Sequence, residues 1–217
     1  MFSVAFGKKT CYTLKKEKGQ KMKYINQLNY PHIPYPTKVK MEEFAPDGIK
    51  STVRSSGCGL CSVCMAIDIL TDKTLDIEEC VSISKECVAN HSRGTDMNIL
   101  GPVIAEKFDI EYSKTSDLCE AIKHIQEGGV IIVHVGVPEG KEIGLFTKGG
   151  HYMLLISTDG KDFCFLDPSY SEEKFKLPER LGRVDESRAP YLYAPIETVD
   201  SECKPAKVKY HMFKRKR

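Results

Sequence analysis

The stretch Ser56-Gly57-Cys58-Gly59-Leu60 sets a cysteine between two glycines, directly before an apolar run from Val63 to Leu70. The run predicts a helix that begins near Cys58. The glycines allow the backbone to turn sharply and leave the sulfur uncovered. Because the N-terminus of a helix lowers the pKa of a thiol placed there, the stretch favours a reactive thiolate at Cys58.

A histidine and a carboxylate follow later in the chain. The histidine directly precedes one apolar run, and the carboxylate directly follows another. The histidine closes Gly149-Gly150-His151 and opens the strand-like run Tyr152-Met153-Leu154-Leu155-Ile156. Asp167 follows the second run, Phe163-Cys164-Phe165-Leu166. A hairpin of the two runs, turned at Asp159-Gly160, would bring Asp167 close to His151.

A cysteine, a histidine and a carboxylate in this order are the parts of a thiol nucleophile with its base and orienting group. Taken singly, Cys58 fits a small core residue and His151 fits a structural histidine, so the prediction depends on the combination. Asp159 and Asp162 compete with Asp167 as the orienting group. Asp159 belongs to the predicted turn, and Asp167 is favoured because the proline after it ends the strand.

Composition places the chain among soluble globular proteins and excludes several partners. Its 217 residues are 41% hydrophobic and 29% charged, with a formal net charge of +2. These values fit one domain with a buried core and no obligate polyanion. Lysines gather at 8–23 and 204–217 without a nucleic-acid-binding motif, so we expect solvated tails and no nucleic-acid partner.

Cysteine usage and hydropathy predict a cytoplasmic protein that contacts no membrane. No apolar run reaches the length of a membrane span, and residues 1–9 lack the order of a signal peptide. The nine cysteines are an odd number, and several fall inside predicted helices and strands. This pattern is typical of reduced thiols rather than of a secreted disulfide framework.

Hydrophobic periodicity predicts an α+β chain in which helices come first and strands follow. We expect a basic tail or edge strand over 1–22 and a single domain over 23–217. That domain would have a helical lobe at about 58–127 and an antiparallel sheet lobe at about 128–217, with the site between them. The predicted helices are 58–71, 76–90, 96–107 and 117–126, the further strands are 110–113, 130–135 and 207–213, and residues 37–57 are expected to be a loop.

The chain resembles the papain-like cysteine peptidases of the bacteriocin-processing (double-glycine-leader) group, in its stand-alone, soluble branch. The matching stretches cover most of residues 24–170, whereas residues 171–217 can hardly be matched. They are Tyr24–Tyr30, Ser56–Met65, Gly94-Thr95, Gly129–Gly136, Gly149–Ile156 and Phe163–Pro168.

The resemblance implies a two-lobed papain-like fold and hydrolysis of a peptide bond through an acyl-enzyme. Cys58 would be the nucleophile, His151 the base and later the acid, and Asp167 the orienting group. Gln27 matches the upstream glutamine whose side-chain amide, with the backbone N–H of the nucleophile, forms an oxyanion hole. Leu60 stands where the family commonly has proline, a residue that suits a first helical turn but is not required chemically.

Other interpretations stay open. The chain shows no transporter portion, so the leader-peptide substrate is not carried over, and beyond a peptide or protein the substrate is not assigned. The same triad could serve amide hydrolysis or acyl transfer on a non-protein substrate, because the acyl-enzyme chemistry is shared. A non-catalytic peptide-binding relative is a third interpretation, and the oligomeric state is open.

Two overlapping Cys-x-x-Cys spacings, Cys58 to Cys61 and Cys61 to Cys64, could instead indicate a metal or redox site. A second pair of ligands at short spacing is missing from the sequence. We therefore expect Cys61 and Cys64 to be core residues, and we expect no metal and no cofactor. The remaining histidines are expected to be structural or exposed, namely His32, His91, His124, His134 and His211.

Overall fold

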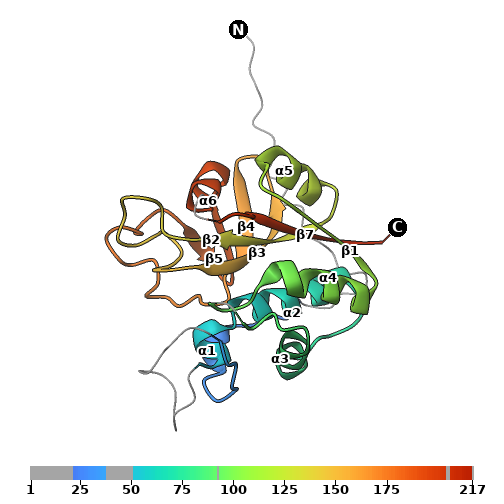
Figure 1. Cartoon of the computed structure of the whole chain (residues 1–217). Helices are drawn as coiled ribbons and strands as arrows, with labels where there is room; N and C mark the ends of the chain where they lie inside the picture. Colours follow the sequence, from blue (N-terminus) through green and yellow to red (C-terminus); the bar gives the residue numbers. More distant parts are fainter. Residues whose placement is uncertain (1–21, 38–50, 92, 204–205, 217) are drawn as a thin grey trace.

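The computed structural model describes residues 22–37, 51–91, 93–203 and 206–216. The predicted tail over 1–22, apart from its last residue, and most of the predicted loop over 37–57 lie outside these residues. Figure 1 shows a central sheet with helices on both of its faces.

The sheet has seven strands in the order β1-β7-β2-β3-β4-β6-β5. All of its neighbouring strands are antiparallel. The strands are β1 (Ile110–Thr115), β2 (Val130–Val135), β3 (His151–Thr158), β4 (Asp162–Leu166), β5 (Asp185–Arg188), β6 (Tyr191–Pro195) and β7 (Tyr210–Arg215).

The β3–β4 hairpin confirms the predicted turn. Leu154 pairs with Leu166 and Thr158 pairs with Phe163. The Asp159 carboxylate accepts the backbone N–H of Asp162 at 2.8 Å, and Gly160 takes a φ of +86° that glycine adopts without strain. The hairpin therefore returns the end of β4 toward the start of β3.

Alternating side chains bury both faces of the sheet. On β3, Leu154 packs into one core while Met153 and Leu155 pack into the other. Both faces are covered, so the central strands are almost continuously apolar, as the sequence of β2 also shows.

Helices of the first half of the chain cover one face, as Figure 1 shows. They are α2 (Cys58–Leu70), α3 (Ile77–Glu86) and α4 (Met97–Phe108), with α2 against β3. Two helices cover the other face, α5 (Leu118–Gln126) and α6 (Ile196–Glu202). Two elements of the segment expected to form the helical lobe therefore lie elsewhere. Strand β1 pairs with β7 in the sheet, and α5 packs on the face of the sheet opposite α2.

Several elements differ from the predictions. The predicted loop over 37–57 contains the short helix α1 (Val53–Ser56), and a 3-10 turn, η1 (Gln27–Asn29), lies before it. The helix predicted over 76–90 ends at Glu86, because the following chain turns back and Val88 takes a positive φ. Strands β5 and β6 and helix α6 were not predicted. Among the described residues, each helix is too short or too polar to cross a bilayer.

Candidate active site

Two helices meet at Gly57, and the junction positions the cysteine. Gly57 ends α1 by donating its N–H to Val53 at 2.8 Å, and its carbonyl accepts the N–H of Cys61 in α2 at 2.9 Å. A Cβ on Gly57 would lie 2.5 Å from the Val53 side chain. Only glycine fits this junction without displacing α1, and it sets Cys58 as the first residue of α2.

Close packing requires glycine also at position 59, directly after Cys58. A Cβ on Gly59 would lie 2.8 Å from the Cβ of Thr95. The Thr95 hydroxyl is held by the buried Tyr35 hydroxyl at 3.0 Å, so it has little freedom to move away. Gly59 therefore lets the first turn of α2 seat against the segment before α4.

The structure brings the three sequence-predicted residues together. His151 begins β3 and Asp167 directly follows β4, and the His151 Nε2 lies 2.8 Å from the Asp167 Oδ1. An ionised carboxylate only accepts hydrogen bonds, so the Nε2 carries the hydrogen and the Nδ1 is left for another partner. The Cys58 thiol is hydrogen-bonded to His151, and Cys58 as a whole is half-buried.

Electrostatics favour an ion pair between these two side chains. Burial alone would raise the pKa of Cys58, but the hydrogen bond and charge of His151 outweigh burial, and the pKa is lowered. Burial and Lys174 act to lower the pKa of His151, while Asp167 and Cys58 raise it, with a net increase. Both shifts stabilise a thiolate beside an imidazolium.

Asp167 is fully buried, and both of its carboxylate oxygens are occupied. Its Oδ1 accepts His151, the Ser169 N–H at 2.8 Å and the Ser169 hydroxyl at 3.1 Å. Its Oδ2 accepts the Lys174 ammonium. Burial would raise the pKa of Asp167, but Lys174 and His151 hold it well below the usual range, so Asp167 is ionised.

Gln27 links the two halves of the site. Its backbone N–H donates to the Pro168 carbonyl at 2.7 Å, beside Asp167. Its side-chain Nε2 donates to the Arg54 carbonyl in α1 at 2.7 Å, just before Cys58. One Nε2 hydrogen is thereby used and the second stays available, while the buried Oε1 accepts no hydrogen bond from the described residues.

The neighbours of Gln27 strengthen this connection. The Tyr24 hydroxyl donates to the Asp167 carbonyl at 2.6 Å, and the Asn26 amide donates to the Tyr170 carbonyl at 2.7 Å. The segment that carries Gln27 is therefore bound along the segment that carries Asp167.

The remaining cysteines of α2 lie in the core. Cys61 and Cys64 are buried, and Cys80 of α3 donates its thiol to the Leu60 carbonyl at 3.8 Å. Burial raises the pKa of Cys61 well above the usual value. Within the described ranges, no three histidine, cysteine or acidic side chains are grouped as a metal ion would need.

Sequence reasoning missed two residues of this cluster, Ser169 and Lys174. Ser169 directly follows the Asp-Pro pair, where a hydroxyl that caps the carboxylate could have been expected. Lys174 follows two glutamates in a segment without periodicity, and no sequence signal distinguishes it from a surface lysine.

Comparison with known proteins supports the fold. No family model and no curated protein matches this chain. A solved structure from Bacillus anthracis, described as a "putative C39-like peptidase", is similar with a TM-score of 0.53 and 12% identity. The match covers 74% of this chain and 89% of that one. The likeness shows an α+β, C39 peptidase-like fold of the papain-like kind, as the sequence resemblance implied.

Proposed function

We propose that this protein is a cysteine peptidase that uses Cys58 as nucleophile, His151 as general base and acid, and Asp167 as the orienting group. The observation that carries the proposal is the linked geometry of the three side chains at the junction of α2 with β3 and β4. Gly149 and Gly150, which precede His151, are exposed, and a Cβ on Gly149 would meet nothing within 4 Å.

The reaction follows from the charges. The Cys58 thiolate attacks the scissile carbonyl carbon, and the carbonyl oxygen becomes an oxyanion. The backbone N–H of Cys58 and the second Nε2 hydrogen of Gln27 are the donors proposed for this oxyanion. His151 gives its proton to the leaving amine, the C–N bond breaks, and a thioester of Cys58 remains.

Water completes the cycle. Neutral His151 removes a proton from water, and the hydroxide formed attacks the thioester carbonyl. The C–S bond breaks, the acid product leaves, and the thiolate–imidazolium pair is restored. Asp167 keeps the Nε2 hydrogen in place throughout, so the Nδ1 faces the thiol and the leaving group in both steps.

A mixed library of peptides, read by mass spectrometry, tests the proposal with the wild-type protein, Cys58→Ala and the matched control Cys61→Ala. We expect cleavage by wild type and Cys61→Ala, and none by Cys58→Ala. Cleavage that survives Cys58→Ala would contradict the proposal. If the protein turns over small amides or esters but cleaves no peptide, the catalytic roles of the three residues stand. The peptidase assignment is then wrong, and the alternative amide hydrolysis or acyl transfer takes its place.

A further inference from the structure

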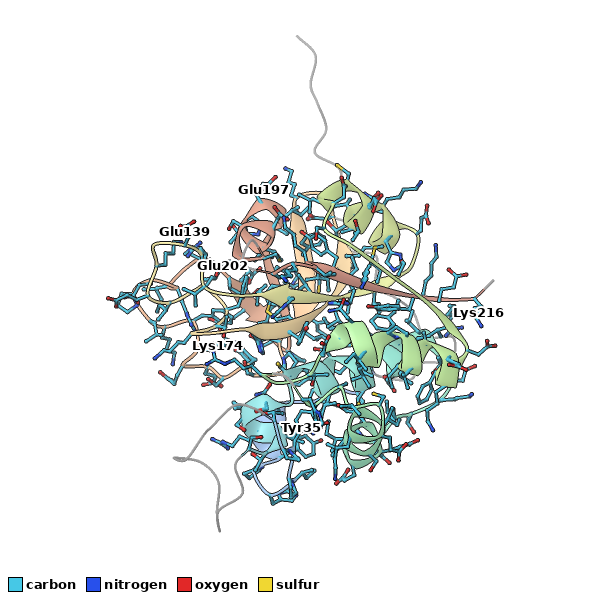
Figure 2. The ribbon with its side chains drawn as sticks, viewed as in Figure 1. Tyr35, Glu139, Lys174, Glu197, Glu202 and Lys216 are labelled. Atoms are coloured by element: carbon cyan, nitrogen blue, oxygen red, sulfur yellow. The ribbon has the colours of Figure 1, made fainter. Side chains whose placement is uncertain are left out.

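A lysine lies behind the proposed triad where it can act on the reaction without touching the substrate. Lys174 has 8% of its side chain exposed, and Asp167 has none. The Lys174 ammonium contacts the Asp167 Oδ2 and donates to the Ser169 hydroxyl at 2.7 Å. Figure 2 shows Lys174 at the loop end of the sheet, away from Lys216 at the other end.

The position of Lys174 is held by its own segment. Its backbone N–H donates to the Ser171 carbonyl at 2.9 Å, and its carbonyl accepts the Arg180 guanidinium at 3.3 Å. Arg180 is buried and also donates to the Gly144 carbonyl, in the loop that leads to His151, at 3.0 Å. These contacts fix the Lys174 ammonium relative to Asp167 and to the loop that leads to His151.

Lys174 compensates the charge of the buried Asp167 carboxylate. A buried carboxylate needs a compensating charge, and a neutral imidazole supplies none. His151 loses its charge during the proposed cycle, when it protonates the leaving amine. With Lys174 present, the carboxylate of Asp167 stays compensated at both stages, and its Oδ1 stays available to His151.

We propose that Lys174 is a positioning residue that neutralises Asp167, so that the carboxylate orients His151 without adding a net negative charge to the site. This inference rests on the proposed function. The Asp167–Lys174 pair then raises the pKa of His151 less than an uncompensated carboxylate would. A purely structural ion pair would support folding but would leave the titration of Cys58 and His151 unchanged.

The direction of the effect follows from the charge of Lys174. A positive charge near the site opposes protonation of His151 and favours the thiolate of Cys58. Removing that charge should raise the pKa of His151 and the pKa of Cys58. The other titratable groups that act on the cluster are unchanged by the replacement, namely Arg180, His134, Tyr24, Cys61, Tyr152 and Tyr35.

The test measures both titrations in the full chain without requiring turnover. The rate of Cys58 alkylation by iodoacetamide against pH, read by mass spectrometry, gives the thiolate midpoint, and the imidazole NMR signal gives the His151 midpoint. We expect Lys174→Gln, which keeps a donor for Asp167, to move both midpoints up by at least about half a pH unit. Lys174→Arg should keep them near wild type.

Lys176→Gln is the matched control, because Lys176 lies two residues after Lys174, is exposed and pairs with Glu173. The control should not move either midpoint. A folded Lys174→Gln protein with wild-type midpoints overturns the proposal, whatever its turnover. A protein that cleaves no peptide still reports both midpoints, so failure of the peptidase assignment is seen separately.

A second comparison covers the case in which Lys174→Gln does not fold. The double variant Asp167→Asn with Lys174→Gln removes both buried charges, which proteins tolerate better than removal of one. Against Asp167→Asn alone, the double variant should again show both midpoints at higher pH. Equal midpoints in these two proteins would overturn the role given to the lysine charge.

Discussion

Two buried histidines on the same sheet have opposite electrostatic surroundings. His151 on β3 is 5% exposed and His211 on β7 is 1% exposed. His151 contacts the ionised Asp167, and its pKa is raised. His211 pairs its Nδ1 with the neutral Tyr112 hydroxyl at 2.9 Å, and burial, with His134 and Lys114, lowers its pKa to about 4.

Similar burial therefore leads to opposite titration, and the difference is the carboxylate. An imidazolium in the core is stable only where a fixed negative charge faces it. The His151 cluster has that charge and can hold a proton for chemistry. The His211 cluster is neutral and serves packing, with His134 stacked on Tyr152 at 4.5 Å between ring centroids.

The largest expected effect separates the two histidines by activity. His151→Ala should lower peptide cleavage by about 10³-fold or more, because the base and acid of the proposed reaction is lost. His211→Gln should leave the cleavage rate of the folded protein within a few-fold of wild type. Steady-state cleavage rates with thermal melts check both. Equal losses of cleavage rate in the two variants would contradict the different roles given to His151 and His211.

The next largest effect on activity is expected from replacing Asp167. Asp167→Asn should cost less activity than Asp167→Ala, because the asparagine carbonyl still accepts the Nε2 hydrogen of His151. Both should cost less than His151→Ala. Asp167→Ala also leaves Lys174 buried without a partner charge, which destabilises a protein by about 3–5 kcal/mol.

Rates for the Asp167 variants must therefore be compared at temperatures where melts show each protein folded. Full activity in a folded Asp167→Ala protein would show that Asp167 is not the orienting group; Asp162, the other aspartate of β4, lies in the Asp159 turn at the opposite end of the hairpin from His151.

Gln27 tests a part of the site outside the charged cluster. Gln27→Ala should slow turnover by about 100-fold, because an oxyanion donor acts on the transition state. The alkylation rate of Cys58 should change little, since the resting thiolate does not depend on that donor. Measuring the turnover rate and the alkylation rate on one preparation separates a loss of oxyanion stabilisation from a loss of the thiolate. Unchanged turnover would remove Gln27 from the site.

The smallest expected effect concerns stability against pH. The pKa of His211 in the folded state, about 4, lies below the ordinary 6.5, so the unfolded state binds the extra proton first. Its stabilising contribution is present above pH 6.5 and is lost as pH falls toward 4, by about 2–3 kcal/mol.

His211→Gln should flatten this part of the stability curve, as measured by urea unfolding from pH 7 to pH 4. An equally steep loss in wild type and variant would contradict the assignment.

The sequence was informative where local pattern and final structure coincide. The glycine-flanked cysteine, the apolar runs of β2, β3 and β4, and the Asp159-Gly160 turn are local features, and each predicted the element found. The pairing of β3 with β4 then brought Asp167 to His151, as the hairpin implied.

The missed features depend on tertiary contacts. Helix α1 has only four residues, fewer than an isolated helix needs, and η1 packs against it. Lys174 became part of the site because an irregular segment folds back onto Asp167, a contact without periodicity. Strands β5 and β6 lie in the part of the chain where no family stretch could be matched.

The most direct test of the account is to identify which cysteine reacts first. The intact protein at pH 6 is treated with a limiting dose of iodoacetamide, and the labelled peptide is identified by mass spectrometry. We expect Cys58 to carry the label ahead of the exposed competitor Cys119, because His151 lowers the pKa of Cys58. Early label on Cys119, Cys61 or Cys64 in place of Cys58 would contradict the claim that the α2 junction holds an activated thiolate.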